Sequence, residues 1–278
     1  MKKQKEIKKA KPFIKWVGGT RQLMETILSL VPKDINTYYE PFLGGGAVLY
    51  SIEAKNKKAS DVNSELINTY NTIKNKLEEL KKELKKHVNE EEYFYMVRAW
   101  DRDENYLTKY TDVERASRFI FLNKTAFNGM WRENKKGHFN VPFGRMKNPK
   151  ILDTENLPLC NKFFQDIDFS TKSFNDILSE IKEGDFIYLD PPYVPLSVTS
   201  SFTSYNKENF SLKMQQELKN FCDELNKKKV KFLLSNSSAD FVLDLYKDYD
   251  ITLVDAKRTI NSKGDGRGSV KEVLVKNY

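Results

Sequence analysis

The sequence contains few of the residues that build disulfide frameworks and zinc sites. Its 278 residues include only two cysteines and two histidines, and these lie far apart along the chain: Cys160, Cys222, His87 and His138. Their positions match neither a disulfide scaffold nor the ligand spacing of a zinc site. We therefore expect no metal, and the isolated cysteines favour a reducing, cytoplasmic compartment.

Long hydrophobic runs are also missing. No stretch approaches the roughly 18 apolar residues of a membrane span, and the lysine-rich residues 1–11 have no hydrophobic segment behind them. These absences argue against a membrane protein and against secretion.

Acidic residues are outnumbered, with 39 Asp and Glu against 47 Lys and Arg and a formal net charge of +8. Such an excess suits a polyanionic partner such as nucleic acid, although basic proteins of other functions are common.

A glycine-rich loop follows a short predicted strand, but it lacks the Gly-Lys-Ser/Thr ending of a P-loop, so ATP or GTP hydrolysis is not indicated. Thr37–Glu40 is the predicted strand, Pro41–Gly46 the loop, and Ala47–Tyr50 a predicted helix start. Glycines let a backbone approach a ligand closely, and a helix N-terminus offers unpaired N–H groups. Glu40 and Asp61 suit a cofactor with ribose hydroxyls and positive charge but no phosphate, such as S-adenosylmethionine.

A second loop, Asp190-Pro191-Pro192-Tyr193, follows the apolar run Asp185–Leu189. The exocyclic amine of a nucleobase is unreactive because its lone pair is delocalised into the ring. Asp190 and a backbone carbonyl of the proline pair are suited to accept both amine hydrogens and free that lone pair. Tyr193 offers a flat face for an extruded base, and neither proline carries a competing N–H donor. The alternative is a strand followed by an ordinary Pro-Pro turn.

These two loops and several further segments resemble, in order, the motifs of the Dam-type DNA adenine methyltransferases. The likeness is greatest to the GATC methylases of DpnII-like restriction-modification systems and extends from about Pro12 to Tyr278. The matching segments are Phe13–Gly19, Tyr39–Gly46, Asp61–Asn63, Phe127–Arg132, Phe139–Arg145, Asp190–Tyr193, Pro195–Ser197, Phe202–Tyr205 and Leu234–Asn236. The resemblance implies methyl transfer from S-adenosylmethionine, without a metal, to the exocyclic amine of a flipped-out adenine in duplex GATC. It also implies a modification enzyme that acts beside a cognate restriction endonuclease without a stable complex.

The resemblance and the residue chemistry together suggest three groups of site residues. The catalytic group is Asp190, Pro191, Pro192 and Tyr193. The cofactor group is Trp16, Gly18, Gly19, Glu40, Pro41, Phe42, Gly44, Gly45, Gly46, Asp61, Asp168, Phe169 and Asp190. The DNA group is Lys15, Phe127, Asn128, Met130, Arg132, Asn140, Pro142 and Arg145.

Within the DNA group, Arg132 is suited to a bidentate contact with guanine, and Asn128 and Asn140 to adenine or backbone. The resemblance implies that Arg132, Met130 and Pro142 lie where base-reading residues are found. It also implies that Phe127 fills the space beside the displaced base and that Lys15 contacts the first guanine. The alternative for each is a surface loop or a hydrophobic plug. In the cofactor group, Asp168 and Phe169 end a predicted strand over Phe163–Phe169 and are expected to bracket an adenine ring; the alternative there is a strand cap.

Strands alternate with helices along much of the chain, which predicts an α/β fold with a doubly wound, mostly parallel sheet. The resemblance implies seven strands and a Rossmann-like methyltransferase fold. Residues 1–62 and 157–278 are the expected cofactor-binding catalytic domain. Residues 63–156 are the expected helical target-recognition domain with a DNA-reading hairpin, because Glu65–Phe127 contains almost no glycine or proline. Both key loops follow strand ends, so they are expected to face each other across the ligand crevice.

One position departs from the family pattern. Many members have a lysine after the two glycines of the first motif, where this chain has Thr20 followed by Arg21. We assign no role to Thr20, and whether Arg21 substitutes is left open. Two further loops are considered: residues 197–205 to close over the base, and residues 258–268 as either a phosphate clamp or a flexible surface loop.

Three other functions remain compatible with parts of the sequence. Methylation of the exocyclic amine of cytosine uses the same chemistry, although its usual loop begins with serine. A nicotinamide oxidoreductase shares the glycine loop but does not explain Asp190–Tyr193. A DNA-binding protein without activity is the third.

Overall fold

The computed structural model of the protein describes residues 8–18, 20–196, 210–257 and 269–278. Gly19 and the two loops considered above, residues 197–205 and 258–268, therefore lie outside the described residues. In the described part of the chain, no helix is both long and apolar enough to cross a membrane.

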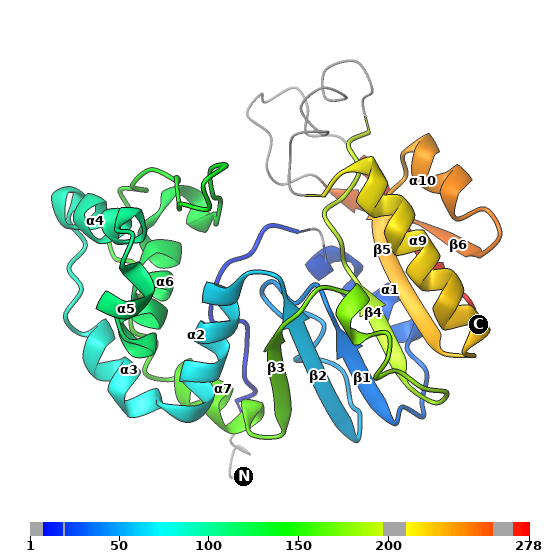
Figure 1. Cartoon of the computed structure of the whole chain (residues 1–278), viewed down its shortest axis with the longest axis horizontal. Helices are drawn as coiled ribbons and strands as arrows, with labels where there is room; N and C mark the ends of the chain where they lie inside the picture. The colour runs from blue at the N-terminus through cyan, green and yellow to red at the C-terminus, as the bar shows by residue number, and fades with distance from the viewer. Residues whose placement is uncertain (1–7, 19, 197–209, 258–268) are drawn as a thin grey trace, which may run out of the picture. The chain divides into compact units, whose positions relative to one another are not determined.

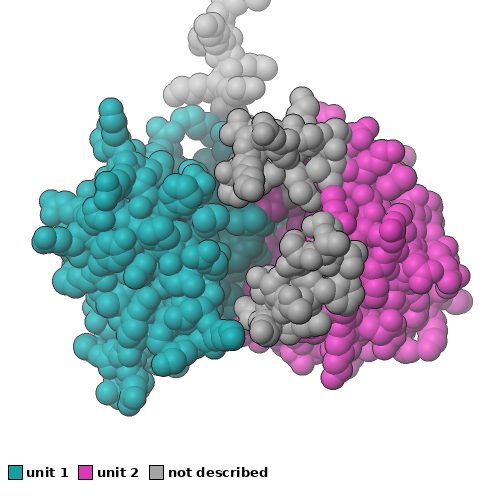
Figure 2. Space-filling model, turned by 90° about the horizontal axis from the view of Figure 1, so that it is seen from above, with its two compact units in different colours: residues 1–17, 44–50, 63–169 teal, residues 18–43, 51–62, 170–278 magenta. Residues whose placement is uncertain are grey.

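The chain divides into two compact units, which Figure 2 shows in different colours. Unit 1 comprises residues 1–17, 44–50 and 63–169, and unit 2 comprises residues 18–43, 51–62 and 170–278. This division differs from the expected boundaries at residues 62 and 157, because segments 44–50 and 157–169 pack with the helices of unit 1. The assignment of separate functions to the two parts of the chain stays a prediction.

The sheet contains seven strands in the order β3-β2-β1-β4-β5-β7-β6 (Figure 1). β1 pairs in parallel with β2 and β4, and β4 with β5, whereas β7 is antiparallel to β5 and β6. The strands are β1 (Thr37–Glu40), β2 (Asn56–Asp61), β3 (Ile167–Thr171), β4 (Phe186–Leu189), β5 (Lys231–Ser237), β6 (Asp250–Lys257) and β7 (Ser269–Lys276). The predicted α/β fold with a mostly parallel sheet is confirmed.

Helices cover both faces of the sheet in unit 2, where α9 (Leu212–Lys227) lies in front of the strands and α1 (Thr20–Leu30) behind them (Figure 1). All four residues of β4 are buried, as expected of a central parallel strand. A short helix, α10 (Asp240–Leu245), precedes β6.

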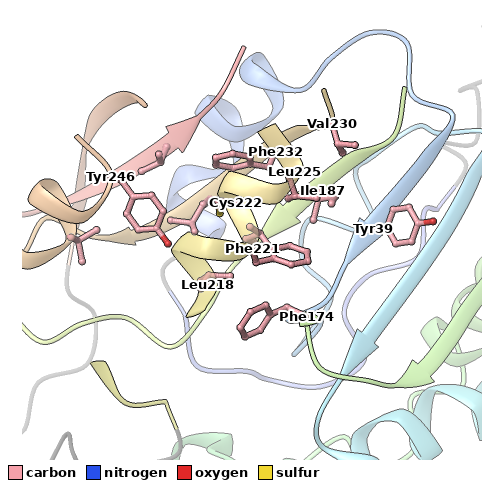
Figure 3. Packing of buried hydrophobic residues seen from close by; sticks show 14 of the residues in the cluster. Tyr39, Phe174, Ile187, Leu218, Phe221, Cys222, Leu225, Val230, Phe232 and Tyr246 are labelled. Atoms are coloured by element: carbon pink, nitrogen blue, oxygen red, sulfur yellow. The ribbon is translucent and has the colours of Figure 1, made fainter. Parts of the chain in front are cut away.

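The core of unit 2 lies between α9 and the central strands (Figure 3). Leu218, Phe221, Cys222 and Leu225 recur along α9 at helical spacing and are buried in the same cluster as Ile187 of β4. Each large apolar side chain buried in this way stabilises the fold by about 1.5–3 kcal/mol. The thiol of Cys222 is therefore part of the core.

Unit 1 is helical, as predicted for the insert. Its α-helices are α2 (Ser64–Asn75), α3 (Leu77–Leu84), α4 (Glu91–Arg98), α5 (Tyr106–Lys109), α6 (Asp112–Thr125) and α7 (Asn156–Phe164). The most buried helix is α6, which packs against α2, α3 and α4. It begins with a capping box in which Thr111 and Glu114 satisfy each other's backbone N–H groups. Among these helices only α7 contains a proline, Pro158 in its first turn, and none contains a glycine, which favours the helical conformation.

Two local predictions are wrong. Residues 47–51 form turns, with Tyr50 N donating to Gly46 O at 3.3 Å, so no helix N-terminus follows the glycine loop. Phe163 and Phe164 end α7, and the strand begins only at Ile167. Both errors arise because a short apolar run fits a strand or a helix equally well by periodicity.

Candidate active site and nucleic-acid interface

The predicted catalytic turn and the first part of the cofactor turn leave the same edge of the sheet in unit 2. β1 ends at Glu40 and β4 at Leu189, and their parallel pairing aligns Tyr39 with Ile187. The strand order runs outward in opposite directions from this pair, to β2 on one side and β5 on the other. Ligands of open α/β sheets bind at the carboxyl ends of the strands at such a reversal. Both turns therefore begin at one edge of the sheet, and their facing each other across the ligand crevice stays a prediction.

Two hydroxyl groups hold the carboxylate of Asp190. Thr20 Oγ1, in the first residue of α1, donates to Oδ2 at 2.7 Å. Ser235 Oγ, on β5, donates to Oδ1 at 2.7 Å and lies 3.0 Å from the Tyr188 hydroxyl. Because the single Ser235 proton is given to Asp190, Tyr188 is the donor to Ser235. Each carboxylate oxygen retains a lone pair that can accept a hydrogen from a ligand.

Burial dominates the electrostatics around this carboxyl group. It raises the pKa of Asp190, and the hydrogen bonds from Thr20 and Ser235 and the nearby hydroxyl of Tyr193 oppose that rise. The pKa of Tyr188 and the pKa of Tyr193 are raised well above the usual value, first by burial and then by the charge of Asp190. Both phenols therefore remain neutral donors.

The two proline carbonyls differ in their partners. Pro192 O accepts a hydrogen bond from the buried amide of Gln215 at 3.0 Å. Within the described residues, no protein donor contacts Pro191 O. A side-chain donor from α9 therefore occupies the carbonyl of Pro192. The turn is tied to the sheet beyond it, because Tyr193 Oη donates to Glu272 Oε2 at 3.2 Å.

The first part of the cofactor turn, residues 40–43, lies largely within the protein. Glu40 is buried and accepts a hydrogen bond from the Tyr38 hydroxyl at 2.6 Å. The ring of Phe42 stacks on Phe174 with 5.6 Å between centroids. The other predicted cofactor residues of this unit differ in exposure, with Pro41 buried, Asp61 partly buried at the end of β2, and Gly18 exposed.

The glycines of the loop accommodate a protein side chain in unit 1. Gly44 has a φ of +47°, and a Cβ added there would lie 2.5 Å from Cδ1 of Trp16. A Cβ on Gly45 would lie 3.0 Å from Cβ of Trp16, and Gly46 has a φ of +66°. The Trp16 ring in turn stacks on Phe119 at 6.4 Å. The missing side chains of Gly44 and Gly45 therefore allow Trp16 to pack closely against the backbone of the loop.

Asp168 and Phe169 lie on opposite faces of β3. Successive strand residues point to opposite faces, and on β3 Asp168 is exposed while Phe169 is buried. The Phe169 ring stacks on Tyr70 at 4.9 Å and meets Phe164 edge-on at 5.1 Å. Phe169 thus contributes its ring to the core of unit 1, and the bracketing of an adenine ring by this pair stays a prediction.

The predicted DNA-reading segment contains an irregular hairpin. Glu133 and Phe139 form an antiparallel bridge, and Asn140 N donates to Arg132 O at 3.0 Å. Across the hairpin, Arg132 Nε donates to Asn140 Oδ1 at 2.7 Å. Arg132 is exposed, and within the described residues its two terminal nitrogens have no protein partner. That fork matches the O6 and N7 acceptors of guanine.

The turn before the hairpin presents Phe127 and Asn128 to solvent. Phe127 is 49% exposed. Asn128 adopts a φ of +55°, a backbone conformation that residues other than glycine seldom adopt. The turn is held by Phe127 N, which donates to the carbonyl of exposed Pro142 at 2.9 Å. The other members of the DNA group also lie in unit 1, with Lys15 exposed, Met130 partly buried and Arg145 exposed and paired with Glu91 at 3.3 Å.

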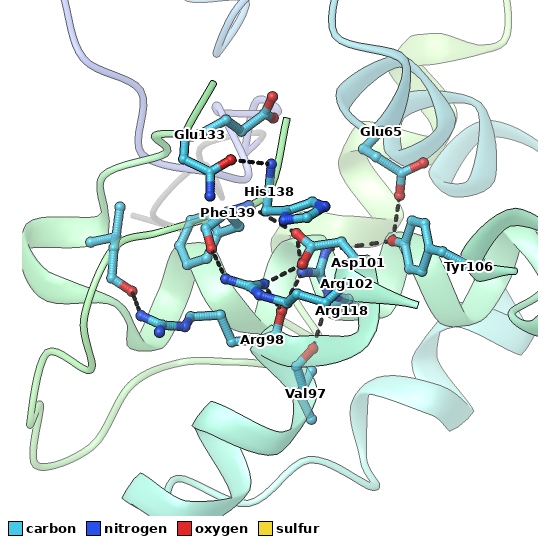
Figure 4. A network of polar contacts seen from close by, with 12 residues as sticks. Glu65, Val97, Arg98, Asp101, Arg102, Tyr106, Arg118, Glu133, His138 and Phe139 are labelled. Carbon is cyan, nitrogen blue, oxygen red and sulfur yellow. Dashed lines mark hydrogen bonds and ion pairs between the residues drawn. The ribbon is translucent and has the colours of Figure 1, made fainter. Parts of the chain in front are cut away.

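A buried ionic network anchors the hairpin to the helices (Figure 4). Arg118 is 1% exposed and forms an ion pair with Asp101 at 2.7 Å. Asp101 Oδ2 accepts from Phe139 N at 2.8 Å, and Arg102 donates to Phe139 O at 2.6 Å. Arg98 donates to Val141 O at 3.1 Å. The hairpin backbone is thus fixed by charged side chains of α4, α6 and the turn between them.

Several residues that hold the candidate site were not identified from the sequence, namely Thr20, Ser235, Gln215, Asn123, Asp101 and Arg118. Only Ser235 lay in a segment that already carried the resemblance. Within the described ranges, no group of three or more His, Cys, Asp or Glu side chains is arranged to hold a metal ion.

Comparisons with known proteins identify the family. Residues 16–260 match the model of the D12 class N6 adenine-specific DNA methyltransferases. The Type II methyltransferase M1.LlaDCHI of Lactococcus lactis subsp. cremoris is 42% identical over 272 residues, which cover 96% of this chain and 95% of the relative. The Type II methyltransferase M.MjaIII of Methanocaldococcus jannaschii is 41% identical over 289 residues, covering 96% and 99%. The DNA adenine methylase of Serratia marcescens is 33% identical over 274 residues, covering 97% and 99%. The predicted resemblance is confirmed, and the chain belongs to the D12 class of N6 adenine-specific DNA methyltransferases.

Proposed function

We propose that this enzyme moves a methyl group from S-adenosylmethionine to the exocyclic amine of a flipped-out adenine in duplex GATC. The observation that carries the proposal is the carboxylate of Asp190 at the end of β4, held by two hydroxyl donors with a lone pair remaining on each oxygen. Beside it, Pro191 O is the proline carbonyl that no described protein group contacts. Together these acceptors suit the two hydrogens of one amine.

In this proposal the chain orients and polarises the base. Asp190 Oδ and Pro191 O accept the two amine hydrogens, which draws the nitrogen toward a tetrahedral geometry and makes its lone pair available. Tyr193 supplies an aromatic face for the base. No strong base is needed before attack, because the nitrogen loses its proton as the new N–C bond forms or afterwards. The rate gain comes mainly from alignment and preorganised acceptors.

The acidic residues of the cofactor turn fit a cationic, ribose-containing cofactor. S-adenosylmethionine would supply an activated methyl group on a sulfonium. Glu40, buried at the end of β1, and Asp61, at the end of the neighbouring β2, are the carboxylates for its ribose and ammonium groups. Trp16, which packs on Gly44 and Gly45, offers an aromatic edge.

GATC recognition is assigned to unit 1. Arg132 presents its free guanidinium fork to a guanine, and Asn140 orients that fork rather than contacting a base itself. Exposed Phe127 fills the space beside the displaced adenine, and Lys15 contacts the first guanine. The relatives named Type II methyltransferases support a role in a restriction-modification system, acting beside a cognate endonuclease on the same double-stranded DNA.

The test is methylation of duplex DNA by the wild-type protein and by Asp190→Ala. Wild-type protein should transfer labelled methyl groups to a GATC duplex and make plasmid resistant to a nuclease that methylated GATC blocks. Asp190→Ala should bind the duplex and lose methylation, whereas the exposed Asp248→Ala is the matched control and should retain it. Near-normal turnover by Asp190→Ala would reject the proposed role.

Two further measurements separate this function from the cytosine methylation and the inactive DNA-binding alternatives. Hydrolysis of the labelled DNA to nucleosides should place the label on adenine; label on cytosine would favour the cytosine alternative. Calorimetric titration with S-adenosylmethionine should release or absorb heat, and the absence of binding would favour a DNA-binding protein without activity.

A further inference from the structure

We propose that Thr20 and Ser235 are positioning residues that keep Asp190 ionised and aimed at the amine of the bound base. This inference rests on the proposed role of Asp190. It gives a function to Thr20, which stands where the family resemblance led us to expect a lysine.

The geometry leaves the carboxylate one orientation. Each of its oxygens accepts one hydroxyl hydrogen at 2.7 Å, from Thr20 on Oδ2 and from Ser235 on Oδ1. Rotation of the carboxylate plane would break both bonds. The donors come from α1 and β5, and both side chains are nearly inaccessible to solvent, with Thr20 8% and Ser235 0% exposed. Water therefore does not readily replace either donor.

The two donors also oppose the cost of burying the charge. Burial favours the protonated acid, which is a weaker acceptor for the amine hydrogen, and a hydroxyl that donates to the carboxylate favours the ionised form. Tyr188 extends this arrangement by donating to Ser235, which makes the serine a stronger donor. Loss of either hydroxyl should therefore raise the pKa of Asp190 further.

Other titratable groups surround Asp190 and must be kept constant in a test. Tyr193, in the same turn, lowers the pKa of Asp190 but donates its hydroxyl proton to Glu272 on β7. On β1, Tyr38 is affected by both Asp190 and Glu40. Substitution of Thr20 leaves these groups unchanged, so Thr20→Val is compared directly with the wild type. Ser235→Ala also removes a hydrogen-bonding partner of Tyr188 and Tyr193 and serves as the second variant.

The decisive measurement is the carboxyl ¹³C shift of Asp190 as a function of pH, in protein labelled with [4-¹³C]aspartate and without substrate. Asp190→Asn identifies the resonance. In Thr20→Val and Ser235→Ala we expect its pKa to rise by about one unit, the size expected for one hydrogen bond to a charged group. Thr20→Ser keeps the hydroxyl and should keep the wild-type pKa.

The pH dependence of turnover should follow the shift in the Asp190 pKa. The acidic limb of the kcat profile should move to higher pH in Thr20→Val, and kcat at neutral pH should fall by about ten-fold, with KM for DNA unchanged. Thr69→Val is the matched control, because Thr69 is also fully buried and donates at 2.7 Å, but to the carbonyl of Glu65. It should leave both the Asp190 pKa and the acidic limb unchanged.

The outcomes separate this inference from the proposed function. A folded Thr20→Val or Ser235→Ala protein with an unshifted Asp190 pKa overturns the inference, even if Asp190→Ala is inactive. Normal methylation by Asp190→Ala overturns the proposed function, whatever the titration shows. Thermal unfolding establishes which variants are folded, and because each hydroxyl acts on its own oxygen, either variant is sufficient for the test.

Discussion

Asn123 holds the backbone of Lys15 through both ends of its amide. Lys15 N donates to Asn123 Oδ1 at 2.9 Å, and Asn123 Nδ2 donates to Lys15 O at 2.8 Å. The same Nδ2 donates to Gly129 O at 3.1 Å. One fully buried side chain of α6 therefore joins the segment that carries Lys15 to the turn that carries Phe127 and Asn128.

Asn123→Asp should weaken DNA binding more than it slows turnover. The substitution keeps the shape of the side chain but removes both Nδ2 donor bonds, so a carboxylate faces two carbonyl oxygens. We expect KM for a GATC duplex to rise by roughly ten-fold, or about 1–2 kcal/mol, because the two predicted DNA-contacting segments lose their common anchor. The measurement is steady-state kinetics at one fixed salt concentration.

The chain offers a matched control for this change. Asn156 makes the same reciprocal pair with the Lys11 backbone, at 3.0 and 2.8 Å, but has no bond to the DNA-reading turn. Asn156→Asp should leave KM for DNA near the wild-type value. Equal effects of the two substitutions would contradict a specific role of Asn123.

Arg132→Ala should relax discrimination at one base pair of the site. Loss of a bidentate contact costs about 1–3 kcal/mol at that position. Asn140→Ala, which removes only the 2.7 Å support of the Arg132 fork, should relax the same position by a smaller amount. Rates on duplexes carrying each single-base change provide the measurement.

A lysine at the tip of the same hairpin distinguishes base reading from general attraction to DNA. Lys136 is exposed, and Lys136→Ala should weaken binding to all duplexes alike if it contacts phosphate. If Arg132→Ala instead lowers the rates on every duplex by one common factor, Arg132 does not read a base.

Gly44→Ala should disturb Trp16 and weaken cofactor binding. An alanine would have to adopt a φ of +47°, which costs about 1–2 kcal/mol, and its Cβ would lie 2.5 Å from Cδ1 of Trp16. We expect altered tryptophan fluorescence and a higher dissociation constant for S-adenosylmethionine by calorimetry. Gly137→Ala is the control, because its φ is +78° but no atom lies within 4 Å of the added Cβ. An altered fluorescence with unchanged cofactor affinity would remove Trp16 from the cofactor site.

His87 should make the stability of the fold depend on pH. Its ring stacks on Phe121 at 4.4 Å and contacts Tyr93 Oη and Ser117 Oγ at 2.9 and 3.0 Å. Burial, with a smaller effect from the charge of Lys86, lowers the pKa of His87 from 6.5 to about 4. Between these pH values the unfolded chain binds a proton that the folded chain does not bind. The free energy of unfolding should therefore fall as pH decreases from 6.5 to 4, by up to about 3 kcal/mol.

Denaturant unfolding across this pH range measures the effect. His87→Gln removes the titrating group and should give a shallower pH dependence, whereas His138→Gln, the other histidine of the chain, is the control. Parallel curves for the wild type and His87→Gln would show that His87 does not contribute.

The sequence alone was sufficient for the family and for most of the sheet. β1 was predicted with its observed bounds and β4 to within one residue, because each is a short run of apolar or β-favouring residues next to a turn signal. The order of the motifs along the chain identified the methyltransferase family, and the carboxyl ends of adjacent parallel strands placed Glu40 and Asp190 at one edge. These features depend on local residue patterns, which a sequence displays directly.

The tertiary structure alone decided which partners surround the candidate site. Thr20 donates a hydrogen bond to Asp190, which lies 170 positions away in the sequence. Gln215 donates one to the Pro192 carbonyl, 23 positions away. The Phe169 ring stacks on Tyr70, a contact that depends on how α2 packs. Hydrogen bonds and ring contacts act over a few ångströms in space, whereas residue spacing constrains only neighbours along the chain. Such partners are therefore fixed only when the helices and strands have packed together.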